Sequence, residues 1–250
     1  MIDMKTVLIT GASRGIGAAC ATTCARLGWA VAVNYSRDAQ AAQLVAARAE
    51  TFGVPAIDEQ ADVSDEAQVM AMFERIDAKL PPLHGLINNA GVVDVRTRVD
   101  QLTMARIQRM FAINVFGTML CAREAVKRLS TLHGGSGGNI VNLSSVAATL
   151  GSPGLYVDYA ASKGAIDSFT IGLAREVAAE GIRVNAVRPG IIDTEIHASG
   201  GQADRAQQSI SMIPMRRVGR ADEIAAAIGW LLGDGSSYAT GAILDVSGGR

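Results

Sequence analysis

The chain has 250 residues, of which 49% are hydrophobic, 19% charged and 4% aromatic, which is enough for one sizeable α/β domain with a buried core. Its 23 basic and 24 acidic side chains leave a formal net charge of -1, so global charge does not suggest nucleic acid or an anionic membrane surface as a partner. The N-terminus shows no signal-peptide pattern and no apolar run could span a bilayer, so we expect a cytoplasmic protein without membrane contact.

The cysteines and histidines do not form a metal-binding pattern. Cys20 and Cys24 would share a helix face and Cys121 stands apart, while the three histidines are scattered along the chain. No spacing among them matches a zinc site. We therefore expect three buried thiols in a reducing compartment and no metal site.

A strand, a glycine-rich turn and a helix begin the chain. Residues 6–10 (TVLIT) form an apolar, β-branched run typical of a buried strand, residues 11–17 read GASRGIG, and residues 18–27 have helical character. Glycines allow close backbone approach and a helix N-terminus presents free N–H groups, so this order predicts a phosphate site. A glycine turn spaced G-x-x-x-G-x-G would alone also fit a plain turn; the strand and helix around it favour the phosphate site.

The second predicted strand, 30–35, bears on the choice of dinucleotide. In NAD-binding folds an acidic residue near the end of this strand takes the ribose 2′-hydroxyl. Here residues 34–37 read NYSR, and the first carboxylate is Asp38. Arg37, with Arg14 in the glycine turn, could instead hold a 2′-phosphate through charge-assisted hydrogen bonds. The sequence therefore favours NADP over NAD, with a solvated loop charge as the alternative for Arg37.

Strands and helices continue to alternate to the end of the chain. We predict further strands at 54–61, 83–87, 139–143, 182–187 and 242–246. We predict further helices at 39–52, from 64 or 65 onward, and at 103–129, 157–179 and 221–232. Repeated units of this length indicate an α/β fold: a Rossmann-like, doubly wound parallel sheet of about seven strands with helices on both faces, in one domain spanning 1–250.

Ligands of such sheets bind beyond the carboxyl ends of the strands. Asp62 follows the third predicted strand, where it either faces an adenine edge or closes a turn. Residues 191–217 follow the sixth strand, show the least regular pattern in the chain, and are predicted to close over substrate as a lid rather than form a plain surface excursion. The side chains there are mixed, with apolar and polar members Met212, Ile213, Met215, His197, Ser199 and Arg205. Leu155 and Tyr156 are further candidates for lining the pocket.

A phenol and an ammonium stand four residues apart in the predicted helix 157–179. That spacing places Tyr159 and Lys163 on one face of the helix. A free tyrosine titrates near pH ~10, and a neighbouring cation would favour the phenolate and bring its pKa toward the working range. Such pairs also arise freely on amphipathic helices, so the interpretation depends on the other motifs. The same holds for Asn114, which in an apolar helix commonly makes a structural hydrogen bond.

Taken together, these motifs resemble those of the short-chain dehydrogenase/reductase family over essentially the whole chain. The matching stretches are 10–17 (TGASRGIG), 88–91 (NNAG), Asn114, 144–145 (SS), 159–163 (YAASK) and 188–190 (RPG). Their order and spacing are far more specific than any one motif. The sequence is most similar in appearance to bacterial glucose-dehydrogenase-like and 3-oxoacyl-carrier-protein-reductase-like members.

The resemblance implies a catalytic tetrad of Asn114, Ser145, Tyr159 and Lys163. In the family the tyrosine exchanges the substrate proton, and the lysine lowers the pKa of that tyrosine and binds the nicotinamide ribose. The serine hydrogen-bonds the reacting oxygen, and the asparagine holds a water of the proton relay. The family serine precedes the tyrosine by thirteen residues, whereas Ser145 stands fourteen before Tyr159 and Ser144 fifteen. The position of the strand end favours Ser145, with Ser144 as the alternative.

The resemblance and the phosphate turn together define a candidate NADP(H) site, in which Thr194 corresponds to the amide-anchoring threonine of the family. The candidate cofactor-binding residues are Gly11, Ser13, Arg14, Gly15, Ile16, Gly17, Asn34, Tyr35, Ser36, Arg37, Asp62, Val63, Asn89, Ala90, Gly91, Tyr159, Lys163, Pro189, Gly190, Ile192 and Thr194. Related proteins are commonly tetramers, so we expect a homotetramer or homodimer packed through helices such as 103–129 and 157–179.

We therefore expect an NADP-dependent oxidoreductase that moves a hydride between nicotinamide and a small-molecule carbonyl or secondary alcohol, with Tyr159 as general acid/base. One alternative is a dinucleotide-binding sensor or scaffold without turnover, against which the complete Asn/Ser/Tyr/Lys set argues. Another is a lyase or epimerase on the same fold. Sugars, steroids, quinones, acyl thioesters and small ketones all remain possible substrates.

Overall fold

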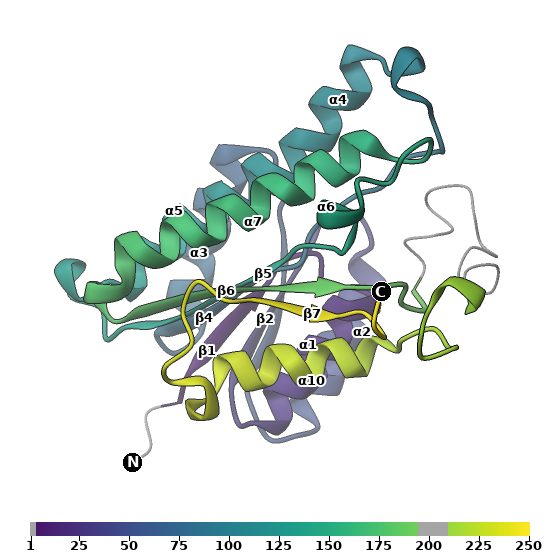
Figure 1. The fold of residues 1–250 in the computed structure, drawn as a ribbon. Coiled ribbons are helices and arrows are strands. Elements are labelled where there is room, and N and C mark those ends of the chain that lie inside the picture. The colour runs from purple at the N-terminus through teal and green to yellow at the C-terminus, as the bar shows by residue number, and fades with distance from the viewer. Residues whose placement is uncertain (1–3, 195–209) are drawn as a thin grey trace.

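A parallel sheet of seven strands in the order β3-β2-β1-β4-β5-β6-β7 organises the chain. The computed structural model describes residues 4–194 and 210–250, drawn as a ribbon in Figure 1. The strands are β1 Thr6–Ile9, β2 Ala30–Tyr35, β3 Ala56–Gln60, β4 Leu83–Asn88, β5 Gly138–Leu143, β6 Ile182–Pro189 and β7 Ile243–Val246. This architecture confirms the predicted Rossmann-like α/β fold class.

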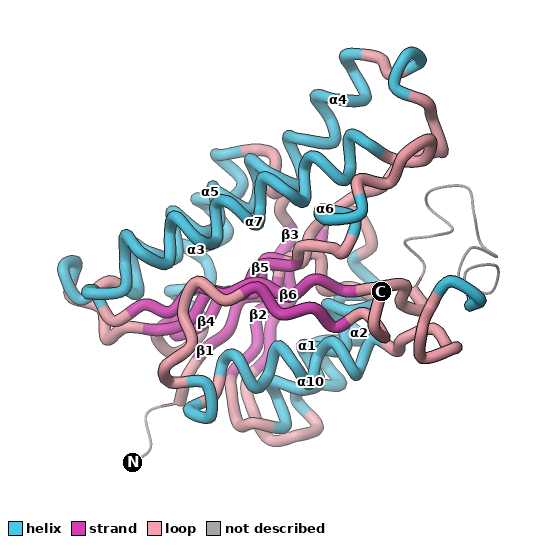
Figure 2. Tube along the Cα trace, in the orientation of Figure 1, coloured by secondary structure: helices cyan, strands magenta, loops and turns pink. Residues whose placement is uncertain are grey.

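Helices cover both faces of the sheet, as Figure 2 shows. Their bounds are α1 Gly15–Arg26, α2 Ala39–Glu50, α3 Glu66–Lys79, α4 Met104–Phe111, α5 Thr118–Leu129, α6 Ala147–Leu150, α7 Val157–Val177 and α10 Ala221–Leu232. One apolar core packs α1, α2 and α10 against the sheet, and a second packs α3, α5 and α7 against the opposite face. The inner strands are buried on both sides, which explains why β1 and β2 read as continuous apolar runs.

The predicted helix 103–129 is not continuous. After α4 the chain forms a π-helical turn, η2 Ala112–Gly117, and only then continues as α5. Gly117 in this turn packs directly on Val63, because a Cβ at Gly117 would come within 2.7 Å of that side chain. A π-helical turn depends on such contacts rather than on local propensity, and turns of this kind often occur at functional sites.

The topology creates a switch point at the carboxyl ends of the central strands β1 and β4. From β1 the chain proceeds outward to β2 and β3, then returns to β4 on the other side of β1 and proceeds outward again. The connections that leave the carboxyl ends of β1 and β4 therefore run to opposite sides, and in parallel α/β sheets ligands bind at this point. The glycine turn follows β1, and Asn89 and Ser144 follow β4 and β5 at the same edge.

The predicted lid 191–217 is described in two pieces, 191–194 and 210–217. Ile192 pairs with Gly219 in a short parallel bridge, and Ile191, Ile213 and Val218 form a small apolar cluster. His197, Ser199 and Arg205, named above among the lid side chains, lie outside the described residues. Among the described helices, none is long and apolar enough to cross a membrane.

Candidate active site

The glycine turn after β1 has a backbone that requires glycine. Gly11 and Gly15 have positive φ angles of 60° and 56°, which side-chain-bearing residues rarely adopt. A Cβ at Gly17 would lie 2.7 Å from the carbonyl oxygen of Gly11, and one at Gly11 would lie 2.9 Å from the Cα of Ala90. The turn therefore has no space for a side chain at Gly11 or Gly17. Helix α1 begins within this turn, at Gly15.

The end of β2 is hydrogen-bonded to this turn. Asn34 is 1% exposed; its Oδ1 accepts the N–H of Gly11 at 3.1 Å, and its Nδ2 donates to the carbonyls of Glu59 at 3.2 Å and Ala61 at 3.1 Å. The sequence placed Asn34 among the cofactor residues, but its side-chain amide is occupied by protein partners. Tyr35 is also buried.

The surface beside the turn carries two cations. Arg14 directly precedes α1 and Arg37 follows β2, and both side chains are exposed, as is Ser36. The main chain joins the two segments, because Ala12 N–H donates to the carbonyl of Asn34 at 2.7 Å. The segments that carry Arg14 and Arg37 are therefore adjacent at the carboxyl ends of β1 and β2.

Asp62 closes a turn, one of the two alternatives open from the sequence. Its Oδ1 accepts the backbone N–H of Ser64 at 2.9 Å and the Ser64 hydroxyl at 2.7 Å. Asp65, rather than Ser64, caps α3 by accepting the N–H of Gln68 at 3.1 Å. Val63 is buried against η2, so it is a packing residue at this position.

The segment after β4 is hydrogen-bonded to the glycine turn. The Oγ1 of Thr10 accepts the N–H groups of Asn89 and Ala90, each at 3.0 Å. Asn89 Nδ2 in turn donates to the carbonyls of Thr10 and Gly11, each at 2.9 Å. The NNAG motif therefore holds the ends of β1 and β4 in a fixed relation across the switch point.

The tyrosine and lysine of α7 lie on one face, as their spacing predicts. Lys163 Nζ stands 5.8 Å from the centroid of the Tyr159 ring and donates to the carbonyl of Leu143 at 2.6 Å. Lys163 is 5% exposed, and burial lowers its pKa to about 8, opposed by the negative charge of Asp167. A buried cation thus lies beside a half-buried phenol.

Asn114 joins three elements through its side chain. Its Oδ1 accepts the N–H of Val92 at 2.8 Å, and its Nδ2 donates to the carbonyl of Val92 at 3.0 Å and to Ser162 Oγ at 3.1 Å. Ser162 donates in turn to the carbonyl of Tyr159 at 2.7 Å. The amide is fully buried, so the asparagine connects η2 both to the loop after β4 and to the start of α7.

The two adjacent serines have different environments. Ser144 is buried, and its hydroxyl donates to the carbonyl of Lys163 at 3.3 Å. Ser145 is half-buried, and its Oγ accepts the N–H of Ala147, the first residue of α6, at 3.1 Å. The hydroxyl proton of Ser144 therefore points into the protein, whereas Ser145 Oγ accepts a bond and has no acceptor for its own proton among residues 4–194 and 210–250.

An ion pair fixes the residue next to the tyrosine. Arg106 of α4 donates from Nε to Asp158 Oδ2 at 2.7 Å and from Nη2 to Oδ1 at 3.2 Å. Its Nη1 donates to the carbonyl of Val95 and to Thr97 Oγ1, both at 2.6 Å. The side chains of Arg106 and Asp158 are 9% and 2% exposed. One guanidinium therefore ties the start of α7 to the loop after β4.

A cavity of about 400 Å³ opens at this edge of the sheet, within the size range of small-molecule sites. Of the residues predicted from the sequence, those that line it are Ile16, Asn89, Gly91, Ser145, Tyr159, Lys163, Pro189, Gly190, Ile192 and Thr194. The alternative serine Ser144 and the pocket candidates Leu155 and Tyr156 line it too. Arg14, Ser36, Arg37 and Asp62 lie outside this cavity.

Some lining residues were not identified from the sequence. They are Val93, Leu143, Val146, Ala147, Leu150, Ser152, Pro153 and Arg250, whereas Ile191 belongs to the predicted lid. Most belong to the short helix α6 and the segments beside it. With four residues, α6 is too short to show a helical period in the sequence. Arg250 follows β7 at the same sheet edge as the other strand ends, so its position after a predicted strand was the available signal.

Comparisons with known proteins agree with this geometry. A family model described as enoyl-(acyl carrier protein) reductase matches residues 11–250. The uncharacterized oxidoreductase YgfF of Escherichia coli is 56% identical over 247 residues, covering 99% of this chain and 100% of that protein. Glucose 1-dehydrogenase 2 of Bacillus subtilis is 35% identical, covering 98% of this chain and 94% of that protein.

A solved structure extends the likeness to three dimensions. A short-chain dehydrogenase from Burkholderia cenocepacia, in complex with NADP, superposes with a TM-score of 0.89 at 36% identity, covering 98% of this chain and 97% of that one. Sequence and fold therefore agree over nearly the whole length. The chain belongs to the short-chain dehydrogenase/reductase family of oxidoreductases.

Proposed function

We propose that this chain transfers a hydride between NADP(H) and a carbonyl or secondary alcohol, with Tyr159 exchanging the proton on the substrate oxygen. The observation that carries the proposal is the buried ammonium of Lys163 beside the Tyr159 ring, with Ser145 lining the same cavity. A nearby cation favours the phenolate over the phenol. Tyr159 can then act as an acid or a base close to neutral pH.

Residues around the glycine turn fit a dinucleotide. A Cβ at Gly11 or Gly17 would collide with main-chain atoms, and the first N–H groups of α1 emerge from this turn, an arrangement that suits a pyrophosphate. A Cβ at Gly91 would lie 3.7 Å from Lys163 Nζ, so the loop after β4 passes close to the lysine. The bound nicotinamide would supply the hydride chemistry.

The remaining site residues orient the substrate and the proton donor. The Ser145 hydroxyl donates a hydrogen bond to the reacting oxygen and so stabilises the charge that develops there. Asn114 keeps Val92 and Ser162 in place, and through Ser162 it holds the main chain of Tyr159. Thr194 lines the cavity at the end of β6, where it would bind the nicotinamide amide.

We assign NADP rather than NAD because the end of β2 offers Arg37, with Arg14 across the turn, and no carboxylate in residues 34–37. A guanidinium binds a phosphate through parallel, charge-assisted hydrogen bonds. The Burkholderia relative with bound NADP supports this choice. Arg37→Asp is expected to weaken NADPH binding far more than NADH binding in fluorescence titrations, and equal losses would contradict the assignment.

Tyr159→Phe tests the proton-transfer role. Removing the hydroxyl should lower the rate of carbonyl reduction by roughly 10²–10⁴-fold, while NADPH binding, measured by fluorescence, stays within a few-fold of the wild type. Tyr238→Phe is a matched control, because Tyr238 is fully exposed and lies outside the cavity. Turnover that survives in Tyr159→Phe across a panel of ketones and aldehydes would refute the role of this tyrosine.

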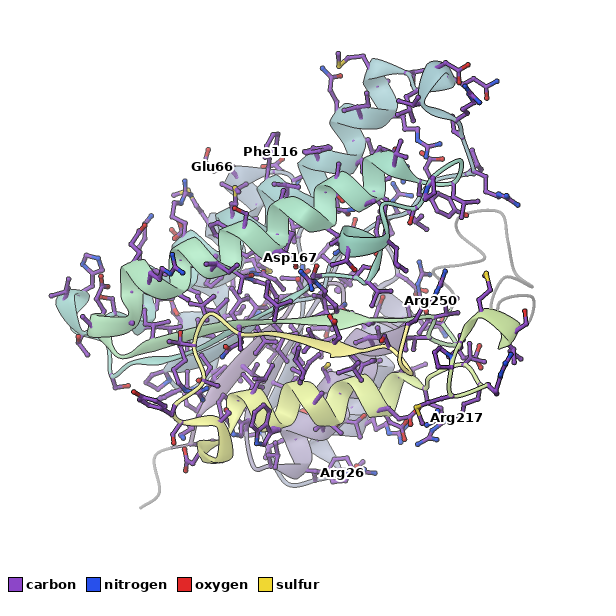
Figure 3. All side chains as sticks on the ribbon, in the orientation of Figure 1. Arg26, Glu66, Phe116, Asp167, Arg217 and Arg250 are labelled. Atoms are coloured by element: carbon purple, nitrogen blue, oxygen red, sulfur yellow. The ribbon has the colours of Figure 1, made fainter. Side chains whose placement is uncertain are left out.

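The proposal also includes a homo-oligomer and a lid over the site. The outer surface of α4, η2 and α5 exposes Met104, Phe116 and Met119, and Phe116 is labelled on that surface in Figure 3. Exposed apolar side chains of this kind suit a homotetramer or homodimer interface. The protein acts in the cytoplasm as a single domain spanning 1–250, and the lid predicted at 191–217 is described here only at 191–194 and 210–217. Analytical ultracentrifugation of Phe116→Glu tests the interface.

A further inference from the structure

A second carboxylate of α7 follows the lysine by one helical turn. Asp167 stands four residues after Lys163, so both side chains lie on one face of the helix. It is 7% exposed, and Figure 3 shows it between α7 and the sheet. Its Oδ2 accepts two hydrogen bonds from Arg188 of β6, from Nε at 3.0 Å and from Nη2 at 2.8 Å. Its Oδ1 is buried without a hydrogen-bond partner among the described residues.

Arg188 is shared between two carboxylates of unequal exposure. Its Nη1 lies 3.5 Å from Asp245 Oδ1 of β7, whose side chain is 53% exposed. Solvent screens that outer pair, whereas the inner pair with Asp167 is largely buried. Charges of alternating sign therefore run from Lys163 through Asp167 and Arg188 to Asp245, and the end at Lys163 lies deepest in the protein.

The proposed chemistry needs a charged lysine at the place where burial disfavours charge. The hydrogen bond from Lys163 Nζ to the Leu143 carbonyl contributes a dipole rather than a full negative charge. Burial alone favours the neutral amine. A neutral amine would give Tyr159 no electrostatic assistance, so a buried negative charge near Lys163 has a direct consequence for the site.

We propose that Asp167 is a positioning residue of this site, whose carboxylate, oriented by Arg188, keeps Lys163 charged beside Tyr159. The charge coupling is a property of the folded protein and does not depend on turnover. Its consequence for catalysis rests on the proposed function. Asp167 is not among the residues that line the cavity, so it acts through Lys163 and not on the substrate.

Among residues 4–194 and 210–250, the other groups packed near Lys163 do not provide that charge. On α7 the remaining titratable neighbour is Tyr159, and Arg106 of α4 is paired with Asp158. The segments β5, η2 and α6 carry no ionisable side chain. From β6 and β7 the charged groups on this side are Arg188 and Asp245. Asp167 is thus the buried anion nearest to Lys163 along α7.

Two substitutions should move the pKa of Lys163 in opposite directions. Asp167→Asn keeps the shape of the side chain but removes its charge and leaves Arg188 positive, so it should lower the pKa of Lys163 by about one unit, a tenfold change in the ammonium–amine equilibrium. Arg188→Gln removes the cation and leaves Asp167 facing Lys163, so it should raise that pKa. A purely structural role of the pair would shift both variants in the same direction or in neither.

The pKa is read by NMR titration of the folded protein labelled with ¹³C at the lysine ε-carbons, with the Lys163 resonance assigned by its loss in Lys163→Met. Glu176→Gln is the control, because Glu176 is an exposed carboxylate of the same helix. It should leave the pKa of Lys163 unchanged. An unmoved pKa in Asp167→Asn, or a lowered one in Arg188→Gln, would overturn the proposal. If Asp167→Asn does not fold, the sign of the Arg188→Gln shift decides alone.

Turnover separates this inference from the proposed function. The pH profile of kcat for carbonyl reduction should change in Asp167→Asn along with the pKa of Lys163. A pKa that shifts as expected while the pH profile stays unchanged would leave the charge coupling intact. It would instead refute the role assigned to Lys163 in the reaction.

Discussion

The ion pair between Arg106 and Asp158 makes a quantitative prediction, because it is buried and adjoins Tyr159. Arg106→Met removes the guanidinium while keeping an unbranched side chain of similar reach. Asp158 then remains 2% exposed without its bidentate partner, and two further bonds, to the Val95 carbonyl and to Thr97 Oγ1, are lost. We expect a large loss of stability and a displaced start of α7.

The magnitude follows from the burial of the pair. Breaking a buried ion pair by removing one partner costs about 3–5 kcal/mol, because the other charge stays buried and uncompensated. Asp158 lies in the first turn of α7, where the helix dipole favours an anion by roughly 0.3–1 kcal/mol. We therefore expect the lower end of the range, about 3 kcal/mol of unfolding free energy.

Urea denaturation followed by circular dichroism measures this loss, at one protein concentration because assembly would otherwise shift the midpoint. Arg98→Gln is the control: its pair with Asp100 has side chains 77% and 64% exposed, and it should cost less than about 1 kcal/mol. The double variant Arg106→Met/Asp158→Asn removes both charges and should recover part of the loss. A cost in Arg106→Met no larger than that of the exposed control would refute the reasoning.

Three further predictions concern the site. Gly17→Ala should lower the unfolding free energy by about 1–3 kcal/mol and weaken NADPH binding, measured by fluorescence, because its Cβ would lie 2.7 Å from main-chain atoms. Ser145→Ala should lower kcat by roughly 10²–10³-fold, and a larger loss in Ser144→Ala would reverse the choice of serine. With its pKa lowered to about 8, Lys163 should add stability as pH rises from there toward ~10.4, a rise that denaturation of Lys163→Met should not show.

Local signals in the sequence were sufficient for the strands and the glycine turn. The run at 6–10 and the alternation of strands and helices predicted β1 to β7 to within a few residues, because buried parallel strands are apolar along their whole length. The spacing of Tyr159 and Lys163 was likewise sufficient to place both on one face of α7. These features depend on neighbours in the chain, and a single sequence contains them.

Features that depend on tertiary contact were not predictable in the same way. The π-helical turn at Asn114 and the four-residue helix α6 have no period of their own. Asn34 was assigned to the cofactor from its position at a strand end, yet its amide is occupied by Gly11 and by the strand beside it. The partner of Asp158 lies 52 positions away, a pairing that only the packing of α4 against α7 creates.

The two arginine pairs of α7 bear on how the tyrosine and lysine are held. At about 100° and 1.5 Å per residue, Asp158 and Asp167 project about 180° apart and about 13 Å apart along the helix axis. Arg106 of α4 holds the first and Arg188 of β6 holds the second, so one helix is fixed on opposite sides by two different elements. Lys163 and Tyr159 lie within about 80° of Asp167 around the axis. A rotation of α7 that moved the phenol from the cavity would therefore have to break at least one buried ion pair.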